Sequence, residues 1–440
     1  MQRSHHTQRI LSHELPGRAG QQVRLAGWIH RRRLLKSVAF LILRDASGLA
    51  QVVVEDGPTR AQLESLGEET TVSVVGRAVS NPVAPGGVEV VDPVIEPLTD
   101  PAAPPPFDLY RPDLSASLPT MLDAAYVALR HPKLAATHRV AAAAVAGFRH
   151  ALDELSFVEI HTPKIVGTAT ESGANVFRLD YFGRPAYLAQ SPQFYKQIMV
   201  GVFERVYEVG PVFRAEPSDT GRHLAEYTSL DAELGFVADH REVMAVCRAA
   251  VAGMLDAASG RAADALRLLG VEVPGLPAEV PIVHFADAME MISAGTGEDV
   301  TGELDLSPVH ERFLGDWALR EHGSDFVFVE GYPTAARAFY SHPDPARPGY
   351  SRAFDLIFRG VELVSGAQRL HRYGDYVSVL RERGVTDLAP YAGYLDAMRH
   401  GMPPHGGFAF GLERFVARLL DVPNVRQVTL FPRDLHRVSP

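Results

Sequence analysis

The sequence predicts an α+β protein that consists of a small N-terminal β-barrel and a larger domain of mixed helices and strands. Two observations predict the barrel and its boundary. Over the first hundred residues, short runs rich in Val, Ile and Leu alternate with turn residues, which is the pattern of successive strands. Seven prolines then fall between residues 93 and 112, where they indicate a stiff linker to a second domain.

The barrel is expected to contain five strands, with one short helix over residues 59–66 between the third and the fourth. This order is typical of an OB barrel, a fold that binds oligonucleotides, although another small barrel without that role fits the strand count equally well. The predicted strands cover residues 23–29, 39–44, 50–55, 71–76 and 88–91.

The predicted domains are the barrel at 1–105, a proline-rich linker or hinge at 106–130, and the larger domain at 131–440. In the larger domain, the spacing of apolar residues predicts helices over 139–155 and 239–257. Runs at 206–213 and 229–236 are expected to be strands.

Composition limits the class of protein. Hydrophobic residues make up 46% of the 440 residues, enough to bury a large core, and the mean hydropathy is −0.03. We find no apolar run of the ~18 residues that a membrane helix needs and no apolar leader, so we expect a soluble, cytoplasmic protein. The single cysteine, Cys247, excludes a disulfide scaffold or a cysteine-ligated zinc site within one chain.

Charge and motif searches exclude several kinds of nucleotide binding. The net charge of −10 does not favour nucleic-acid binding by the whole surface, but the three arginines at 31–33 form a local basic patch. The sequence contains no G-x-x-x-x-G-K-[ST] loop, no complete G-x-G-x-x-G and no H-E-x-x-H. If the protein uses ATP, it must hold ATP in another way.

Three segments carry residues suited to phosphate chemistry. One is Phe-Arg-Ala-Glu at 213–216, followed by Arg222, His223 and Leu224, and another is Gly-Gly-Phe-Ala-Phe-Gly-Leu-Glu-Arg at 406–414. The third is looser, a long helix followed by Phe-Val-Glu-Ile at 157–160 and Pro163. In chain order these segments resemble motifs 1, 2 and 3 of the class II aminoacyl-tRNA synthetases. The barrel in front, and Leu-Phe-Pro-Arg-Asp at 430–434, are similar to subclass IIb.

The resemblance implies an enzyme that activates an amino acid with ATP and transfers it to tRNA. The amino-acid carboxylate attacks the α-phosphate and pyrophosphate leaves, so positioned cations and magnesium matter more than a base. Arg214 corresponds to the α-phosphate ligand and Arg414 to the γ-phosphate ligand of a bent ATP. The small residues Gly406, Gly407 and Gly411 are expected to let the backbone approach the nucleotide. The other implied ATP-site residues are Glu216, Arg222, His223, Leu224, Glu362, Gly411, Leu412 and Glu413.

The residues alone leave other interpretations open at some of these positions. Arg414 also fits a surface salt bridge, and His223 a packed surface histidine. Glu362 and Ser365 supply hard oxygen donors three residues apart, and the resemblance implies that they hold the Mg²⁺ that bridges the phosphates. An edge strand with an exposed ion pair fits the same segment.

The segment Gln-Ser-Pro-Gln-Phe-Tyr-Lys-Gln at 190–197 resembles the amino-acid pocket of the aspartyl enzymes. There Gln193 and Lys196 line the pocket, and Arg369 corresponds to the arginine that binds the side-chain carboxylate. Lys196 and Arg369 are expected to form a dipositive pocket that favours a carboxylate over an amide. Asparaginyl enzymes usually have an uncharged residue where Lys196 stands.

The segment Thr-Glu-Ser-Gly-Ala at 170–174 resembles the loop that closes over the substrate. Glu171 is expected to bind the ammonium group of L-aspartate, with Asp231 as a second candidate. Arg214 and Ser365 are expected to contact the same substrate.

In the barrel, Arg32, Phe40 and Gln51 have the spacing of the aspartyl enzymes' anticodon-binding residues. Phe40 is expected to stack on a base and Gln51 to read the central uridine, unless Phe40 belongs to the barrel core. Discriminating archaeal enzymes have Trp and Lys where this chain has His30 and the loop 81–85, which contains Pro82. Because these positions surround the last anticodon base, we expect relaxed reading and charging of both tRNA-Asp and tRNA-Asn.

The resemblance is closest to aspartyl-tRNA synthetases of the archaeal and eukaryotic type, since there is no room for the bacterial insertion. It implies a catalytic domain with an antiparallel sheet flanked by helices, and a homodimer formed through motif 1. Three alternatives are an asparaginyl-tRNA synthetase, a tRNA-independent asparagine synthetase paralogue and a non-enzymatic nucleic-acid-binding module. Lys196 disfavours the first, the barrel the second and the complete motif set the third.

Overall fold

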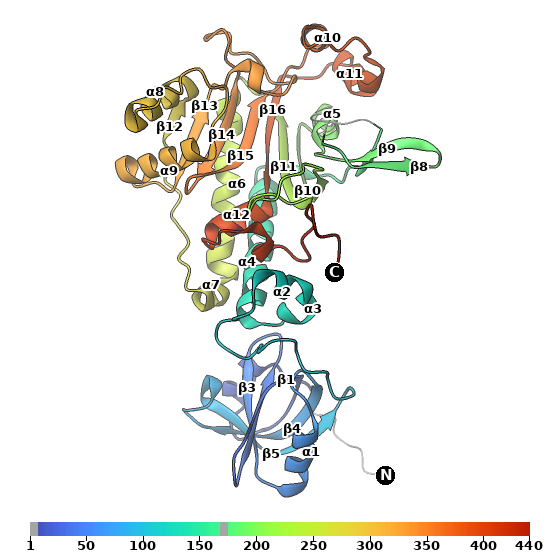
Figure 1. The fold of residues 1–440 in the computed structure, drawn as a ribbon, viewed down its shortest axis with the longest axis vertical. Coiled ribbons are helices and arrows are strands. Elements are labelled where there is room, and N and C mark those ends of the chain that lie inside the picture. Colours follow the sequence, from blue (N-terminus) through green and yellow to red (C-terminus); the bar gives the residue numbers. More distant parts are fainter. Residues whose placement is uncertain (1–7, 168–174) are drawn as a thin grey trace. The chain divides into compact units, whose positions relative to one another are not determined.

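The computed structural model describes residues 8–167 and 175–440, and the chain divides into two compact units between Ser117 and Leu118 (Figure 1). The first unit is a closed barrel and the second a large sheet with helices. The predicted α+β class is therefore confirmed.

The barrel has the strand order β1-β2-β3-β5-β4 and one helix after the third strand, as the sequence predicted for an OB fold. Asp56 ends the loop before the helix and accepts a hydrogen bond from the Thr59 amide at 2.8 Å, which caps the helix. The elements are β1 (Gln22–Leu34), β2 (Ala39–Arg44), β3 (Leu49–Val54), α1 (Gly57–Ser65), β4 (Thr71–Ser80) and β5 (Val88–Pro97).

Two parts of the proline-rich stretch are structured. The interpretation of residues 93–97 as linker is wrong, because β5 continues to Pro97. Pro93 lies opposite Gly76, where β4 has a bulge between Val75 and Arg77, a position at which a strand tolerates a residue without an amide hydrogen. Further along, Tyr110 packs edge-on against His30, with ring centres 5.3 Å apart.

The second unit is built on an eight-stranded sheet with the order β12-β13-β14-β15-β16-β11-β10-β6. The neighbours are antiparallel except for the outer pairs β12-β13 and β10-β6, so the expected antiparallel sheet is confirmed. Its strands are β6 (Val158–Glu159), β10 (Arg205–Phe213), β11 (Glu226–Gly235), β12 (Ile282–His284), β13 (Phe326–Glu330), β14 (Ala353–Phe358), β15 (Val361–Gln368) and β16 (His405–Gly411). A smaller sheet contains β7 (Ile165–Val166), β8 (Arg178–Tyr181) and β9 (Arg184–Leu188).

Two long helices, α4 (Pro132–Glu154) and α6 (His240–Arg261), cover one face of the large sheet (Figure 1). They approach closely at Gly147 and Gly253, since a side chain on Gly147 would lie 2.1 Å from the Gly253 carbonyl oxygen. The predicted helices at 139–155 and 239–257 are confirmed, and both extend beyond those ranges. Cys247 is buried between α6 and its neighbours in the core.

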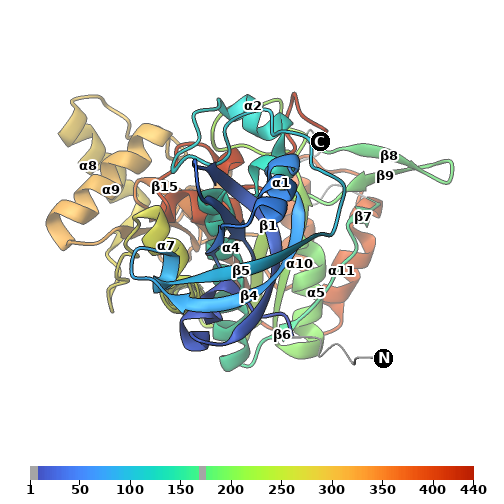
Figure 2. The ribbon, with the colours of Figure 1, turned by 90° about the horizontal axis from the view of Figure 1, so that it is seen from below.

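Five of the remaining helices pack in two groups, which lie on opposite sides of the second unit in Figure 2. Helices α5 and α11 share a core with α10, and α8 and α9 share another with β12, β13 and β14. The bounds are α2 (Leu118–Asp123), α3 (Ala125–Ala128), α5 (Gln193–Phe203), α7 (Ala263–Leu269), α8 (Phe285–Thr296), α9 (Pro308–His322), α10 (Tyr373–Glu382), α11 (Ala392–Arg399) and α12 (Leu412–Leu419).

Helix α6 is long and apolar enough to cross a membrane by length and composition, contrary to the expectation that no such segment exists. Its residues Val243, Val251 and Met254 are fully buried in the core beside α4 and the sheet. The apolar character of α6 is therefore explained by its position as a core helix.

Successive side chains of each central strand point to opposite faces of the sheet, so every second residue faces away from α4 and α6. In β11, Leu230, Ala232 and Leu234 join the core, so Asp231 and Glu233 project from the opposite face. The neighbouring strands β15 and β16 continue this second face of the sheet.

Candidate active site

An open cavity of about 400 Å³ in the second unit is lined by residues of motif 2, motif 3 and the segments between them. Most of the predicted site residues meet there although they are far apart in the sequence. Those that line the cavity are Gln193, Arg214, Glu216, Arg222, His223, Leu224, Glu362, Ser365, Arg369, Gly411, Glu413 and Arg414.

The other predicted residues of this unit have different positions. Lys196 and Asp231 lie below the cavity surface, each only 1% exposed. Leu412 packs against the hydrophobic core and does not line the cavity. Glu171 and the rest of the predicted closing loop at 170–174 lie outside the described residues.

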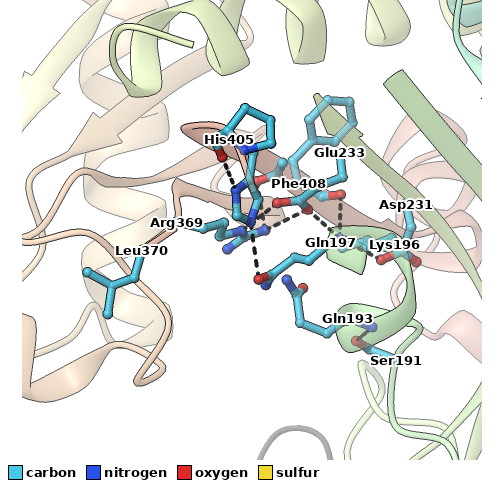
Figure 3. Close-up of polar contacts among 12 residues, drawn as sticks. Ser191, Gln193, Lys196, Gln197, Asp231, Glu233, Arg369, Leu370, His405 and Phe408 are labelled. Carbon is cyan, nitrogen blue, oxygen red and sulfur yellow. Dashed lines mark hydrogen bonds and ion pairs between the residues drawn. The ribbon is translucent and has the colours of Figure 1, made fainter. Parts of the chain in front are cut away.

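Lys196 and Arg369, the residues expected to bind the amino acid, come from α5 and from just after β15 (Figure 3). The Lys196 ammonium lies 3.0 Å from Asp231 and 3.5 Å from Glu233, and it donates to the Phe408 carbonyl at 3.3 Å. Arg369 donates to Glu233 at 3.0 Å. The expectation of a dipositive pocket is therefore wrong, because two carboxylates face the two cations.

Glu233 is the residue that sequence reasoning missed here. It is fully buried, and Arg369 and Lys196 lower its pKa although burial opposes the charged form. A side chain on Gly407 would lie 2.0 Å from a Glu233 carboxylate oxygen, so Gly407 leaves room for this carboxylate rather than for the nucleotide. Two acids two residues apart in a predicted strand share one face, a signal that the sequence did contain.

A buried polar cluster supports this pocket from α5, α10 and α11. The side-chain oxygen Oε1 of Gln197 accepts hydrogen bonds from Tyr376 at 3.1 Å and Tyr394 at 2.6 Å, and His405 Nε2 lies 3.3 Å from the same oxygen. Burial lowers the pKa of His405 to about 4, so its ring is neutral at pH 7. Within the described chain, the Gln193 side-chain amide nitrogen is buried without a hydrogen-bond partner, which leaves a donor for a ligand at the cavity wall.

The phosphate-binding candidates are accessible from the cavity. Arg214 follows the last residue of β10, is 45% exposed, and has its guanidinium 5.6 Å from the ring centre of Tyr227. Arg414 opens α12 and donates to the Glu362 carbonyl at 3.0 Å. His223 is held by Thr220 at 2.6 Å, and burial together with the nearby arginines lowers its pKa. The site therefore presents two arginine forks suited to phosphate oxygens.

An acidic cluster lies beside these arginines. Burial first, and then the neighbouring Asp355 carboxylate, raise the pKa of Glu362 to about 7. Asp355 pairs with Ser365 across β14 and β15, and Arg337 donates to Asp355 at 2.5 Å and to Ser365 at 3.3 Å. Sequence reasoning missed Asp355 and Arg337, because Asp355 is a lone acid in an otherwise apolar strand.

Glu413 lines the cavity, yet its carboxylate is used within the protein. Both oxygens lie within 3.1 Å of the Thr228 amide nitrogen, so Glu413 joins α12 to β11. Burial raises the pKa of Glu413. The geometry thus gives Glu413 a supporting position.

In the barrel, the register places Phe40 and Gln51 on the outer face of the sheet. Their neighbours Leu41 and Val52 are in the barrel core, whereas Phe40 is only half-buried, so the core alternative for Phe40 is wrong. Arg32 pairs with Leu41 and is directed to the other side, where it binds Glu68 at 3.1 Å and the end of α1. The structure therefore brings Phe40 and Gln51 together and leaves Arg32 apart.

Other basic residues take the place expected for Arg32. Arg33 is paired with Phe40, and Arg31 with Ile42, and both arginines are exposed. Because directly paired residues share a face, these two cations lie on the face of Phe40.

His30 and Pro82 differ in accessibility. His30 is 9% exposed, at a bulge in β1, and its ring contacts Arg44 at 3.2 Å and Tyr110. Pro82 is exposed, and the preceding Asn81 donates to Glu89 at 2.8 Å. Glu89 also accepts from Gln51 at 2.9 Å, so the Pro82 loop begins next to the predicted base-reading residue.

Comparisons with known proteins now identify the family. Residues 117–435 match the family described as tRNA synthetases class II (D, K and N), and residues 23–98 match the OB-fold nucleic acid binding domain. The chain belongs to the class II tRNA synthetases. It is an enzyme of the ligase class, as this family membership implies.

Individual relatives place the chain in the aspartyl-tRNA synthetase branch. It is 46% identical to an aspartate–tRNA(Asp/Asn) ligase of Thermus thermophilus, over 98% of this chain and all of the relative. It is 44% identical to the aspartate–tRNA(Asp/Asn) ligase of Deinococcus radiodurans, over 98% of this chain and 99% of the relative. A solved structure of asparaginyl-tRNA synthetase from Pyrococcus horikoshii with asparaginyl-adenylate has a TM-score of 0.91 at 31% identity, covering 98% of this chain and 100% of that one.

The general requirements of the reaction follow from membership in this family. These enzymes use ATP together with a divalent metal, act on tRNA and are soluble proteins. The asparaginyl enzyme has nearly the same fold, so similarity of the fold alone does not select the amino acid. The pocket residues have to supply that selection.

Proposed function

We propose that this synthetase activates L-aspartate with ATP as an aspartyl-adenylate and transfers the aspartyl group to tRNA-Asp and also to tRNA-Asn. The observation that carries the choice of aspartate is the buried Lys196 ammonium beside the Arg369 guanidinium at the end of the cavity. Asp231 and Glu233 hold both cations in place before a substrate binds.

Preset cations favour a carboxylate side chain over an amide. Charge-assisted hydrogen bonds are about twice as strong as neutral ones, so the β-carboxylate of aspartate gains more from Lys196 and Arg369 than asparagine does. Both cations already have carboxylate partners, and they keep these partners when an amide binds. The selectivity we propose therefore comes from what aspartate gains rather than from what asparagine loses.

The adenylation step needs cations around the phosphates rather than a base. Arg214 would bind the α-phosphate oxygens on which charge develops, and Arg414 would bind the γ-phosphate of the leaving pyrophosphate. Arg222 and His223 also line the cavity and would contact the remaining phosphate oxygens. Glu216, Leu224 and Gly411 would contact the nucleotide, and Gln193 the amino acid.

We propose Mg²⁺ as the divalent metal, held by Glu362 and Ser365 with the addition of Asp355. One Asp355 oxygen is buried and, among the described residues, has no hydrogen-bond partner, which fits a ligand to a cation. No group of three His, Cys, Asp or Glu side chains in the described chain forms a complete metal site. Phosphate oxygens and water would therefore have to complete the coordination shell of Mg²⁺, as is usual at ATP sites. When bound, Mg²⁺ neutralises charge on the phosphates.

We further propose a cytoplasmic homodimer that contacts its partner copy through α4. A groove beside α12 is lined by Ala142, Val145 and Ala146 of α4, which lie outside the core, and by Ala141, which packs at the edge of the core. Small apolar residues on a helix face let a second copy approach closely. Changing Val145 to Glu should convert the dimer to a monomer in light-scattering measurements, and an unchanged mass would remove this face from the interface.

The test of the proposed function is ATP–pyrophosphate exchange with aspartate and with asparagine as separate substrates. Aspartate should drive exchange at least 100-fold more efficiently, as judged by kcat/KM, which corresponds to about 2.7 kcal/mol. Equal exchange with asparagine would overturn the assignment. Transfer is tested separately by charging purified tRNA-Asp and tRNA-Asn transcripts with labelled aspartate.

A further inference from the structure

Glu311 on α9 joins two parts of the ATP side of the cavity through one oxygen atom. Its Oε2 accepts a hydrogen bond from the Arg222 guanidinium at 3.0 Å and another from the Glu362 backbone amide at 2.9 Å. Glu311 is 5% exposed. A residue from the segment between motifs 2 and 3 thus contacts both the motif 2 loop and the strand that carries the acidic cluster.

The surroundings of Glu311 make this arrangement unlike ordinary helix packing. The neighbouring buried residues of α9, Leu314 and Ala318, belong to an apolar core. Burying a carboxylate beside them costs free energy unless it is paired and hydrogen-bonded. Both groups that satisfy Glu311 belong to residues that line the cavity.

Glu362 is fixed through its backbone on two sides. Glu311 accepts the hydrogen bond of the Glu362 amide, and Arg414 donates to the Glu362 carbonyl at 3.0 Å. With both main-chain groups engaged, the position from which the Glu362 side chain reaches the cavity is set. Arg222, 34% exposed, is held by one guanidinium nitrogen, so its orientation is restricted while it still faces the cavity.

We propose that Glu311 is a positioning residue for ATP, which presets Arg222 and the Glu362 main chain relative to each other before the nucleotide binds. This inference rests on the proposed function, because it assigns Arg222 and Glu362 to the phosphate end of the site. Preorganised donors and acceptors strengthen binding because less freedom is lost when the ligand arrives. Glu311 itself does not have to touch the nucleotide.

The experiment measures ATP–pyrophosphate exchange for the variants Glu311→Ala and Glu311→Gln, with ATP and aspartate varied separately. Glu311→Ala removes both contacts and should raise the KM for ATP at least tenfold, with the KM for aspartate within twofold of wild type. Glu311→Gln keeps an oxygen that can accept both hydrogen bonds, so it should restore the KM for ATP to within about threefold. The matched control is Glu321→Gln on the exposed side of α9, which should leave both constants unchanged.

A double-mutant cycle with Arg222→Ala tests whether Glu311 acts through Arg222. If it does, Glu311→Ala should raise the KM for ATP much less in the Arg222→Ala background than in the wild type. Equal factors in both backgrounds, or Glu311→Ala and Glu311→Gln that both keep the wild-type KM, would overturn the proposal. If Glu311→Ala does not fold, Glu311→Asp takes its place in the cycle, because the shorter side chain withdraws the carboxylate from both donors. Wild-type exchange driven equally by asparagine would instead overturn the aspartate assignment and leave this comparison intact.

Discussion

The Lys196 ammonium lies 3.0 Å from the Asp231 carboxylate, and both side chains are only 1% exposed. A lysine that is buried so completely keeps its charge only when a carboxylate compensates it. Glu233 provides a second counter-charge at 3.5 Å and is shared with Arg369. The amino-acid pocket is therefore a balanced set of two cations and two anions, and removing one member affects the other three.

Replacing Lys196 with Met should lower kcat/KM for aspartate by at least 100-fold in ATP–pyrophosphate exchange. The change removes one cation from the substrate carboxylate and leaves Asp231 with no partner of comparable strength. Breaking a buried ion pair in this way costs about 3–5 kcal/mol, so the variant should also unfold at a lower temperature.

The KM for ATP separates a local effect from general damage. Lys196→Met should leave this KM within about threefold of wild type, because the Lys196 ammonium contacts Asp231, Glu233 and the Phe408 carbonyl rather than Arg214 or Arg414. Lys36→Met, at an exposed position of the barrel, is the matched control and should change neither substrate constant. Normal aspartate kinetics in Lys196→Met would remove Lys196 from the pocket assignment.

Arg214→Ala and Arg414→Ala should each reduce adenylate formation by a factor of about 10³ or more while the protein stays folded. Both arginines would stabilise charge that develops in the transition state, where one well-placed donor is worth about 2.7–4 kcal/mol. Their side chains are 45% and 31% exposed, so they contribute little to packing. Circular dichroism should superimpose on that of the wild type. Near-normal exchange by either variant would contradict the motif assignment.

The raised pKa of Glu362 predicts a pH effect on stability in the absence of metal and ATP. Its folded-state pKa is about 7, compared with an ordinary value of 4.5. Between these pH values the folded protein keeps a proton that the unfolded chain has lost, so the free energy of unfolding should fall as the pH rises from about 4.5 to about 7. Urea denaturation at several pH values measures this slope.

Glu362→Gln should flatten that part of the stability profile, because the amide does not titrate. The same variant should raise the magnesium concentration needed for half-maximal exchange, and an unchanged magnesium titration would take Glu362 out of the metal site. Glu321→Gln again provides the exposed control and should keep the wild-type slope.

The elements and the motif residues could be predicted from the sequence because their signals are local. Runs of β-branched residues bounded by turns gave the five barrel strands, and the FRxE and GLER segments gave Arg214 and Arg414. These residues do line one cavity. A local pattern does not show which residue a side chain contacts when that residue comes from a distant segment of the chain.

The missed residues are all of that second kind. Asp355 is the one acid in the apolar strand β14, and Glu233 lies in the mixed strand β11. Only the pairing of β11 with β16 and of β14 with β15 shows what their carboxylates face. The expectation of a dipositive pocket was wrong for this reason, since Asp231 was assigned to the substrate ammonium group and Glu233 was not assigned, whereas both face the two cations in the folded chain. Arg32 was placed on the base-reading face because its spacing fitted, whereas the strand register puts Arg31 and Arg33 there.

The barrel offers a direct test of tRNA specificity at the loop that follows β4. Asn81 and Gln51 both donate to one Glu89 oxygen, at 2.8 and 2.9 Å, so the loop is anchored beside the residue expected to read the central base. The loop itself contributes Pro82 and Pro85, both exposed, and contains no lysine. Proline lacks an amide hydrogen, so this loop has few donors with which to recognise the oxygen of a cytosine.

Replacing Pro82 with Lys should introduce a preference between the two tRNAs that the wild-type enzyme lacks. We expect the wild type to charge tRNA-Asp and tRNA-Asn with aspartate at kcat/KM values within tenfold of each other. The new ammonium can donate to the last anticodon base of tRNA-Asp, and one good contact to a base is worth about 1–3 kcal/mol, so the preference should shift by about 5- to 150-fold.

Pro85→Lys adds the same charge three residues away and should improve binding of both tRNAs equally, which controls for general attraction to phosphates. A wild-type preference for tRNA-Asp above ~100-fold, about 2.7 kcal/mol, would show that the enzyme already discriminates and that the proline loop does not relax its reading. Because ATP–pyrophosphate exchange does not involve tRNA, both variants should keep the wild-type exchange rate, and any change in charging can then be assigned to the barrel.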